Sequence, residues 1–381
     1  MTLPAHRVRA VTVTSILVVI VMLAGLTPAL LLAQPVTSNV APIEETSEVE
    51  IDFPRGLIIQ ADLAWESTGS MAELELLYSV AGNETETLVF VPYEDADPGN
   101  SVHADVTIDL QSWFVPAGVA IEYRWRFVEG QEVIAESEPE SAMWFDNRWD
   151  WQAVESDQVR VHFYDHDDAF VQQILDSAQS TVTELEERYI LERSEQLEIW
   201  IYPSSKDFQS AQRPNSRDTI AGAAYPDYFL IVAVIPDGNA RELRRTIPHE
   251  VSHQILFQAT DNPFAYPPLW FNEGMATQFQ TGGTDGYMEM VVRAHQSGAL
   301  FEIGSLDVSF PYQPAQATLA YATSWSVVEY IEVTYGDAGI AALIEAFATG
   351  MPYDEALLSA LGVDSDELDD HWKAWIASPS T

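Results

Sequence analysis

The first third of the chain alternates hydrophobic and polar residues with a period of two. Hydrophobic side chains recur at every second position in residues 74–78 and again in residues 121–127, as in strands that bury one face. Turn-forming sequences rich in Gly, Pro, Asn and Asp separate such runs at residues 81–83 and 97–100. We therefore predict an antiparallel β-sandwich of immunoglobulin or fibronectin type over residues 49–145.

The period changes after residue 145. Residues 168–190 place hydrophobic side chains at helical spacing, whereas residues 197–201 alternate as a strand. Residues 229–235 are continuously apolar, which is typical of a buried strand, and residues 286–377 show the pattern of several helices. The pattern predicts an α+β domain over residues 146–381, with a helical C-terminal part.

The N-terminus has the pattern of an export or anchor segment. Arg7 and Arg9 precede the uncharged residues 10–33, a run long enough to cross a bilayer as a helix. We predict that the first 33 residues anchor the protein in the cell membrane, and a cleaved signal peptide of a secreted protein is the alternative. Either way, the positive-inside rule places the rest of the chain outside the cytoplasm. Residues 34–48 are polar and predict a linker.

Composition narrows the classes of function. The chain has 381 residues, of which 47% are hydrophobic, so it can build real cores and has the length of two domains. It carries 17 basic and 59 acidic residues, a formal net charge of −42, which argues against nucleic acid as a partner. The absence of cysteine excludes disulfides, thiolate metal sites and cysteine nucleophiles.

One short motif carries chemistry. Residues 249–253 read His249-Glu250-Val251-Ser252-His253, and positions i and i+4 of a helix face the same way. Both imidazoles can therefore bind one metal ion, with the Glu250 carboxylate close enough to reach water at that ion. Pro248 removes a helical hydrogen bond, so we expect the helix to kink or to begin there.

A second motif supplies a third ligand. Glu273, in the segment Trp270-Phe271-Asn272-Glu273-Gly274, follows His253 after 19 intervening residues. Three prolines in residues 260–269 predict a connecting loop, so that a second helix can start near Leu269 and run antiparallel to the first. The three side chains together would form a His₂Glu site for Zn²⁺ with an open fourth position.

The two motifs together resemble those of the gluzincin metallopeptidases, and most closely those of the bacterial peptidase MA-like domain. The similarity spans roughly residues 150–377, and the predicted sandwich also resembles a module that often precedes this domain. The resemblance implies a zincin-type fold in which His249, His253 and Glu273 bind zinc and Glu250 acts as the general base.

A peptidase of this kind also needs a hydrogen-bond donor for the oxyanion that develops on the carbonyl oxygen. Tyr321 is our candidate, because a phenol is a neutral donor at pH 7 and its small neighbours Ala320 and Ala322 would let its helix approach the site. The alternative is that Tyr321 is an ordinary core aromatic residue. Tyr312 and His295 are the other candidates.

These observations predict an exported, membrane-anchored zinc metallopeptidase that acts on a peptide or protein, with Glu250 as general base and Tyr321 as oxyanion donor. The buried strand at residues 229–235 is where an extended peptide could pair. The alternative is a non-catalytic cell-surface binding protein with a structural metal site. Glu250 favours the enzyme, because a structural site needs no ionisable group there. The pattern leaves open endopeptidase or aminopeptidase action and the oligomeric state.

Overall fold

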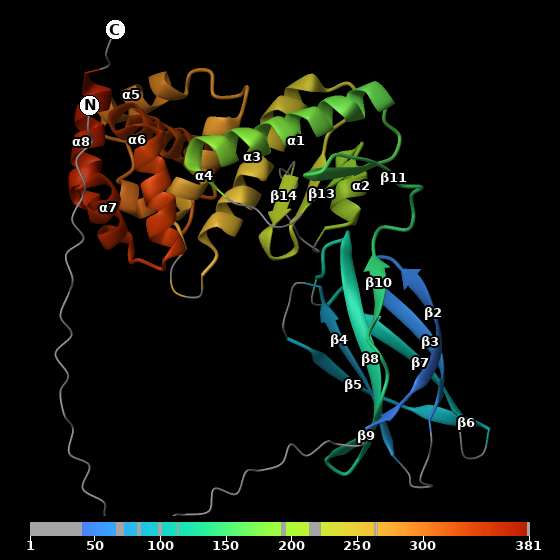
Figure 1. Cartoon of the computed structure of the whole chain (residues 1–381). Helices are drawn as coiled ribbons and strands as arrows, with labels where there is room; N and C mark the ends of the chain where they lie inside the picture. Colours follow the sequence, from blue (N-terminus) through green and yellow to red (C-terminus); the bar gives the residue numbers. More distant parts are fainter. Residues whose placement is uncertain are drawn as a thin grey trace, which may run out of the picture. The chain divides into compact units, whose positions relative to one another are not determined.

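The architecture is that of a computed structural model (Figure 1). It describes residues 40–65, 72–81, 85–97, 101–112, 114–191, 196–212, 222–262, 264 and 266–378. The predicted anchor of residues 1–33 and the first residues of the predicted linker lie outside these ranges. None of the helices within them combines the length and the apolarity that a membrane span requires.

Two sheets in the N-terminal part of the described chain share one hydrophobic core. In the first sheet the order is β1-β9-β8-β4-β5, and β10 also pairs with β8; in the second it is β2-β3-β7-β6. All pairs are antiparallel except β1 with β9. The first sheet comprises β1 (Ala41–Pro42), β4 (Glu73–Val80), β5 (Thr87–Val91), β8 (Val119–Glu129), β9 (Glu132–Glu136) and β10 (Glu140–Trp144). The second comprises β2 (Glu44–Asp52), β3 (Gly56–Ala64), β6 (Tyr93–Asp97) and β7 (Ser101–Asp109).

The period-two pattern correctly located the strands of this core. Residues 74–78 lie in β4 and residues 121–127 in β8, and the two strands pair with Leu76 opposite Trp125. Both of these side chains are fully buried. The more specific prediction of an immunoglobulin or fibronectin type stays a prediction.

The predicted linker of residues 34–48 is wrong in its second half, because β1 and most of β2 lie there. β2 pairs with β3 along its whole length and forms an edge of its sheet, so its outward glutamates face solvent. Its inward positions include Glu45 and Ser47, which contact Trp125 and Tyr123 of β8 through hydrogen bonds. Polar residues on both faces hide the strand from a hydrophobicity pattern.

A third sheet forms the floor of the C-terminal part. Its order is β11-β12-β13-β15-β14, in which β12, β13 and β15 are parallel and the two outer strands are antiparallel to their neighbours. The strands are β11 (Gln152–Glu155), β12 (Val159–Phe163), β13 (Leu197–Tyr202), β14 (Gly222–Tyr225) and β15 (Leu230–Val234). β15 is the predicted apolar strand, but it lies inside the sheet with both edges paired. The idea that a peptide pairs with it is therefore wrong, and the outer strand beside it is β14.

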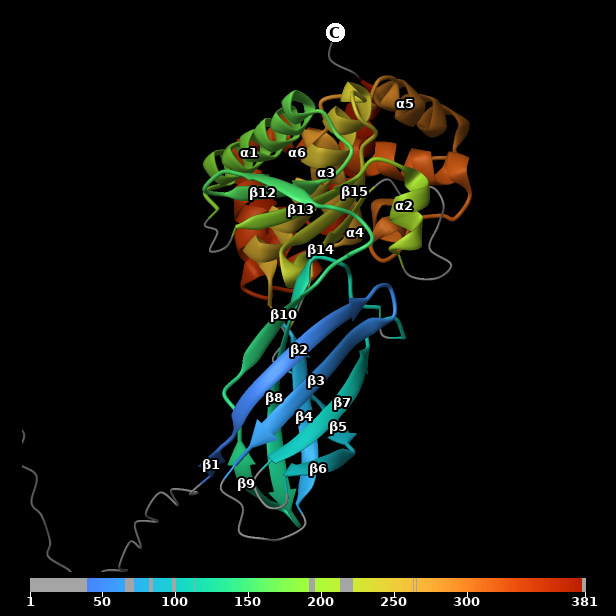
Figure 2. The ribbon, with the colours of Figure 1, turned by 90° about the vertical axis from the view of Figure 1, so that its right-hand side faces the viewer.

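Helices cover one face of this sheet and form the rest of the C-terminal part. Figure 2 shows α1 and α3 over the sheet, and their buried residues share one core with the inward side chains of β12 and β13. The predicted helix at residues 168–190 is confirmed as α1, and residues 286–377 are largely helical as predicted. The helices are α1 (Asp168–Tyr189), α2 (Ser205–Ser210), η1 (Pro226–Tyr228), α3 (Ala240–Thr260), α4 (Leu269–Phe279), α5 (Tyr287–Ser297), η2 (Ile303–Leu306), α6 (Pro314–Ala348), α7 (Tyr353–Leu361) and α8 (Ser365–Ala377). In α6 the chain turns at Gly336.

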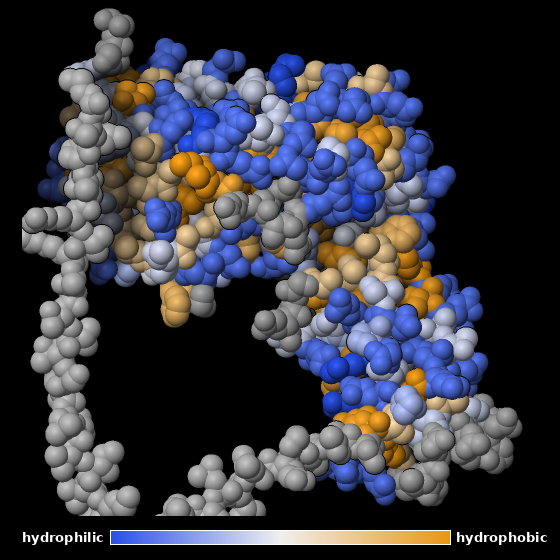
Figure 3. Space-filling model, in the orientation of Figure 1, coloured by the Kyte–Doolittle hydropathy of each residue, from blue (hydrophilic) through white to orange (hydrophobic). Residues whose placement is uncertain are grey.

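The other face of the five-stranded sheet contributes to the N-terminal core. Trp200 and Tyr202 of β13 alternate with the residues that pack under α1 and belong to the same core as the two N-terminal sheets. Asp146 is fully buried, and it accepts a hydrogen bond from the Tyr202 hydroxyl and a bidentate pair from Arg148. Residues 40–381 accordingly form one compact unit, and the predicted domain limit between residues 145 and 146 stays a prediction. Hydrophilic residues cover most of the face seen in Figure 3.

Candidate active site

The first metal motif lies in the middle of α3, which begins after Asn239, whose side chain accepts a hydrogen bond from the Glu242 amide. The helix neither begins nor ends at Pro248, so our expectation of a start there is wrong. Pro248 has no N–H for the carbonyl of Arg244 one turn earlier. That carbonyl instead accepts a hydrogen bond of 3.1 Å from the amide of Thr281, just after α4. The missing helical bond thus links α3 to the end of α4.

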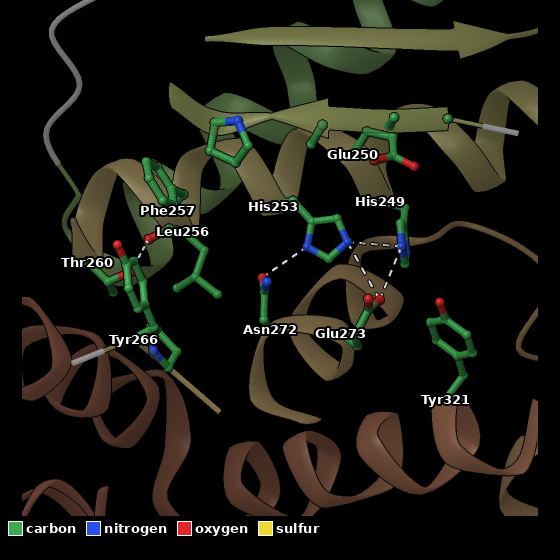
Figure 4. Close-up of a pocket in the computed structure, with 15 residues that line it drawn as sticks. His249, Glu250, His253, Leu256, Phe257, Thr260, Tyr266, Asn272, Glu273 and Tyr321 are labelled. Atoms are coloured by element: carbon green, nitrogen blue, oxygen red, sulfur yellow. Dashed lines mark hydrogen bonds and ion pairs between the residues drawn. The ribbon is translucent and has the colours of Figure 1, made fainter. Parts of the chain in front are cut away.

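The structure brings the three predicted metal ligands together (Figure 4). α4 begins at Leu269, where the proline-rich loop predicted it. Its Glu273 carboxylate lies 3.5 Å from Nε2 of His249 and 3.6 Å from Nε2 of His253, and the two Nε2 atoms are 3.2 Å apart. Among the described residues, this is the only group of three that could hold a metal ion.

This triangle fits zinc. Metal–ligand bonds of 2.0–2.1 Å in tetrahedral geometry separate two ligand atoms by about 3.3 Å, and the three observed separations lie close to this value. The Oε2 atom of Glu273 is buried and has no hydrogen-bond partner among the described residues, which is costly for a carboxylate without a cation. Two imidazoles and one carboxylate are also a donor set that zinc prefers.

The electrostatics of the site concentrate negative charge on Glu273. Burial alone would favour its neutral form, but the two imidazoles hold the pKa of Glu273 well below its usual range. Burial also opposes the charged form of His253, yet the nearby Glu273 carboxylate outweighs it and raises the pKa of His253 to about 9. A buried carboxylate therefore sits where a cation is stabilised.

Two amide side chains orient the histidines, and the sequence gave no reason to assign them this role. The Oδ1 atom of Asn272 lies 2.9 Å from Nδ1 of His253, and the side-chain amide of Gln280 lies 2.7 Å from Nδ1 of His249. An amide oxygen facing an Nδ1–H leaves Nε2 with a free lone pair for a metal. For Gln280 this requires the oxygen of its amide to face the ring. Asn272 precedes Glu273 in the second motif, whereas only the fold places Gln280 here.

Glu250 lies beside the triangle and close to the outer strand β14. It is 8% exposed and lines the same cavity as the metal ligands. A Cβ on Gly222 of β14 would lie 2.7 Å from Oε1 of Glu250 and 2.9 Å from a methyl of Thr246. Glycine at this position therefore allows β14 to approach the carboxylate directly.

Of the three candidate oxyanion donors, the structure brings Tyr321 to the site. Its ring centroid is 6.4 Å from that of His249, and its hydroxyl points toward the ligand cluster (Figure 4). The ring packs edge-on against Phe310, so its position is fixed by packing. Tyr312 is 77% exposed and, like His295, is not among the residues that line the cavity.

The approach of α6 to the site depends on Gly274. A Cβ there would lie 2.6 Å from the carbonyl oxygen of Ser324 and 2.6 Å from Cγ2 of Val328 on α6. Glycine in the second motif thus lets α4 and α6 pack closely and places Tyr321 near Glu273. The cavity in front of the ligands has a volume of about 410 Å³, within the usual size of ligand pockets.

Comparison with solved structures finds zinc metallopeptidases of the M1 group from Deinococcus radiodurans. One crystal structure is 11% identical, covers 90% of this chain and 95% of that chain, and has a TM-score of 0.36. A mutant of that enzyme bound to a Tyr-Ser-Ala substrate is 10% identical, with the same coverage and a TM-score of 0.37. These scores are too low to support an argument about this chain. No curated protein matches the sequence.

The sequence profile of one protein family, described as the peptidase MA superfamily, matches residues 177–378. The match covers more than half of the chain, runs from α1 to the end of α8, and includes both metal motifs. It confirms the resemblance seen in those motifs, and with it a zinc cofactor, which the ligand triangle fits. The chain belongs to the peptidase MA superfamily of zinc-dependent peptidases.

Proposed function

We propose that this protein is an exported, membrane-anchored metallopeptidase of the gluzincin type, with zinc held by His249, His253 and Glu273. The observation that carries the proposal is the buried triangle of ligand atoms at one side of an open cavity, with the Glu250 carboxylate beside it. The family match supports peptidase activity in general, and the site supports the roles of the individual residues.

The chemistry divides between the metal and the chain. When bound, zinc supplies Lewis-acid polarisation of the peptide carbonyl and lowers the pKa of water. Glu250 accepts a proton from the attacking water and transfers it to the nitrogen of the leaving amine. The carboxylate suits this work because it lines the cavity while the backbone of β14 excludes bulk water from one side.

Tyr321 acts as the oxyanion donor in this proposal. Its phenol O–H donates a hydrogen bond to the carbonyl oxygen as negative charge develops there. The support is its position opposite the Glu250 side of the cavity, with its hydroxyl directed at the ligand cluster (Figure 4). Because packing against Phe310 fixes the ring, the donor needs little rearrangement to reach the substrate.

An extended substrate pairs with β14. Among the described strands of the sheet it is an outer one, and residues 222–224 line the cavity. Their side chains are absent or small, so the backbone N–H and C=O groups of β14 are accessible to a peptide. Pairing along β14 lays the peptide backbone across the front of the metal ligands.

The alternative function, a binding protein with a structural metal site, is less well supported. Structural zinc sites have four protein ligands and no open position, whereas the described residues supply three ligand atoms facing a cavity. A structural site would also leave the buried Glu250 carboxylate without a purpose.

Metal analysis combined with a peptide-library digest tests the function. Glu250→Gln should keep about one zinc per chain and lose activity by about 10³-fold, near the middle of the range for a general base. Glu242→Gln on the same helix, where the glutamate only pairs with Arg245, is the matched control. Full turnover by the Glu250→Gln protein would rule out the general-base role.

The location is a separate part of the proposal and rests on residues 1–33. In cells, the full chain should remain in the membrane fraction, with a C-terminal tag accessible from outside. Removal of residues 1–33 should leave the protein inside the cell. A soluble mature chain that begins near residue 34 would replace the anchor by a cleaved signal peptide.

A further inference from the structure

The end of the cavity beyond His253 is apolar. Leu256 and Phe257 of α3 and Tyr266 of the following loop lie on the far side of His253 from His249 and Tyr321 (Figure 4). Pro226 and Pro267 complete this end, which we call the side pocket. Among the described residues that line the whole cavity, the only charged carboxylates are Glu250 and Glu273 at the metal end.

The loop that carries Tyr266 is held in place. The side-chain amide of Asn262 donates hydrogen bonds of 2.8 Å to the carbonyl oxygens of Thr260 and Phe347, and its oxygen accepts one of 2.9 Å from the Phe264 amide. Phe347 belongs to the last turn of α6, so these bonds fix the loop to the helical core. A wall that is already ordered loses little entropy when a ligand binds.

Two aromatic rings of this loop are exposed, but they differ in position. Tyr266 is 66% exposed and lines the cavity, whereas Phe264 is 83% exposed and does not. A ring that stands open at the rim of a catalytic cavity gains by covering apolar surface of a bound ligand. Phe264 therefore serves as a natural control for exposure without a place in the cavity.

The distance between the side pocket and the metal ligands defines which substrate residue reaches it. Leu256 follows His253 by three positions, which is about 4.5 Å along a helix. An extended peptide advances about 3.3 Å per residue. A substrate side chain in the side pocket thus belongs to one of the first two residues on one side of the cleaved bond.

We propose that the side pocket selects peptides with a large apolar or aromatic side chain within two residues of the cleaved bond. The inference rests on the proposed peptidase function and adds its substrate class. A charged side chain at the same place finds no partner in the described lining and loses its hydration, which disfavours it.

The test uses end-blocked peptides that carry Phe, Leu, Ala or Asp at each of the two positions on either side of one cleavable bond. At one position, kcat/KM should be at least about tenfold higher with Phe than with Ala, and about 100-fold higher than with Asp, as expected for burying one apolar side chain. Tyr266→Ala should reduce the ratio of Phe to Ala about tenfold. Tyr266→Phe should keep it, because the aromatic surface remains, and Phe264→Ala should not change it.

A binding measurement separates this inference from the function on which it rests. The zinc-loaded Glu250→Gln protein should bind fluorescent Phe peptides about tenfold more tightly than Ala peptides. Equal affinities for Phe, Ala and Asp peptides, with cleavage by the wild-type protein, would overturn the side pocket and leave the peptidase standing. If the wild-type protein cleaves no peptide and the variant binds none, both proposals fail.

Discussion

The N-terminal core and the metal site handle buried polar side chains in opposite ways. In the N-terminal core, Glu45 accepts a hydrogen bond from Trp125 and Ser47 bonds Tyr123, so polar groups tie the two sheets together. In the helical part, His249, His253 and Glu273 point into one shared space beside a cavity. Isolated buried polar groups stabilise a fold, whereas convergent ones cost stability and indicate a ligand.

The two regions also assemble from different distances along the chain. The strand pairs β4–β8 and β8–β9 place neighbouring segments together, and their cores are apolar. The metal site joins three helices, because α4 packs on both α3 and α6 and supplies Glu273 between them. Four paired substitutions, one in each region, test whether chemistry belongs to the helical part alone.

Loss of a metal ligand should have the largest effect. His253→Ala should reduce bound zinc from about one per chain to almost none and abolish peptidase activity, because a three-ligand site loses one third of its donors. His103→Ala is the counterpart on β7, where the histidine is exposed and pairs with Asp62. Metal analysis and activity assays decide the outcome, and zinc loss in the His103 variant would break the comparison.

The paired tyrosines come next. Tyr321→Phe should lower kcat by about 100-fold without changing zinc content, because one oxyanion donor is lost. Tyr123→Phe in the N-terminal core removes a hydrogen bond to Ser47, so it should cost about 1 kcal/mol of stability and leave kcat unchanged. Steady-state kinetics and urea unfolding measure the two effects. A Tyr321→Phe protein with wild-type kcat would remove this residue from the mechanism.

Two glycines test close packing in each region. Gly274→Ala places a Cβ 2.6 Å from Ser324, and Gly56→Ala places one 1.8 Å from the carbonyl oxygen of Ile108. Each should destabilise the protein by about 1–3 kcal/mol, as overpacking does. Only the Gly274 variant should also bind zinc more weakly, because α4 carries Glu273. Equal zinc affinities of the two folded variants would show that α4 can shift without disturbing the site.

The smallest effect concerns an isolated buried carboxyl. Burial, together with repulsion by Asp354, raises the pKa of Asp307 from 3.8 to about 6. The folded chain therefore holds this proton more tightly, so the contribution to stability is present below about pH 4 and is lost as the pH rises through about 6. Asp307→Asn should stabilise the protein above that pH by about 1 kcal/mol, after allowance for solvent screening of a half-buried group.

Urea unfolding at pH 5 and pH 8 measures this difference. Glu45→Gln is the counterpart in the N-terminal core, because burial also raises the pKa of Glu45. Neither carboxyl contacts the metal ligands, so both variants should keep full zinc content. If Asp307→Asn showed the same pH dependence of stability as the wild-type protein, the charged form of Asp307 would carry no cost.

Local patterns explain which parts of the fold were predictable. The helix α1, the strands β13 and β15 and the start of α4 follow from periodicity and prolines within a few residues. The first part of β2 was missed because its inward positions hold Glu45 and Ser47, whose partners lie about 80 residues away on β8. A polar residue that is satisfied by a distant partner looks like a loop residue in the sequence.

The sequence by itself determined the metal chemistry, because the spacing of His249 and His253 within one helix fixes their common direction. Only the tertiary structure decided what surrounds them. The carbonyl left free by Pro248 accepts a bond from Thr281, which places Gln280 against His249. In the same way, Gly222 of β14 meets Glu250, and α6 brings Tyr321 to the cavity. These partners come from separate segments, and packing between elements, which no local pattern encodes, brings them together.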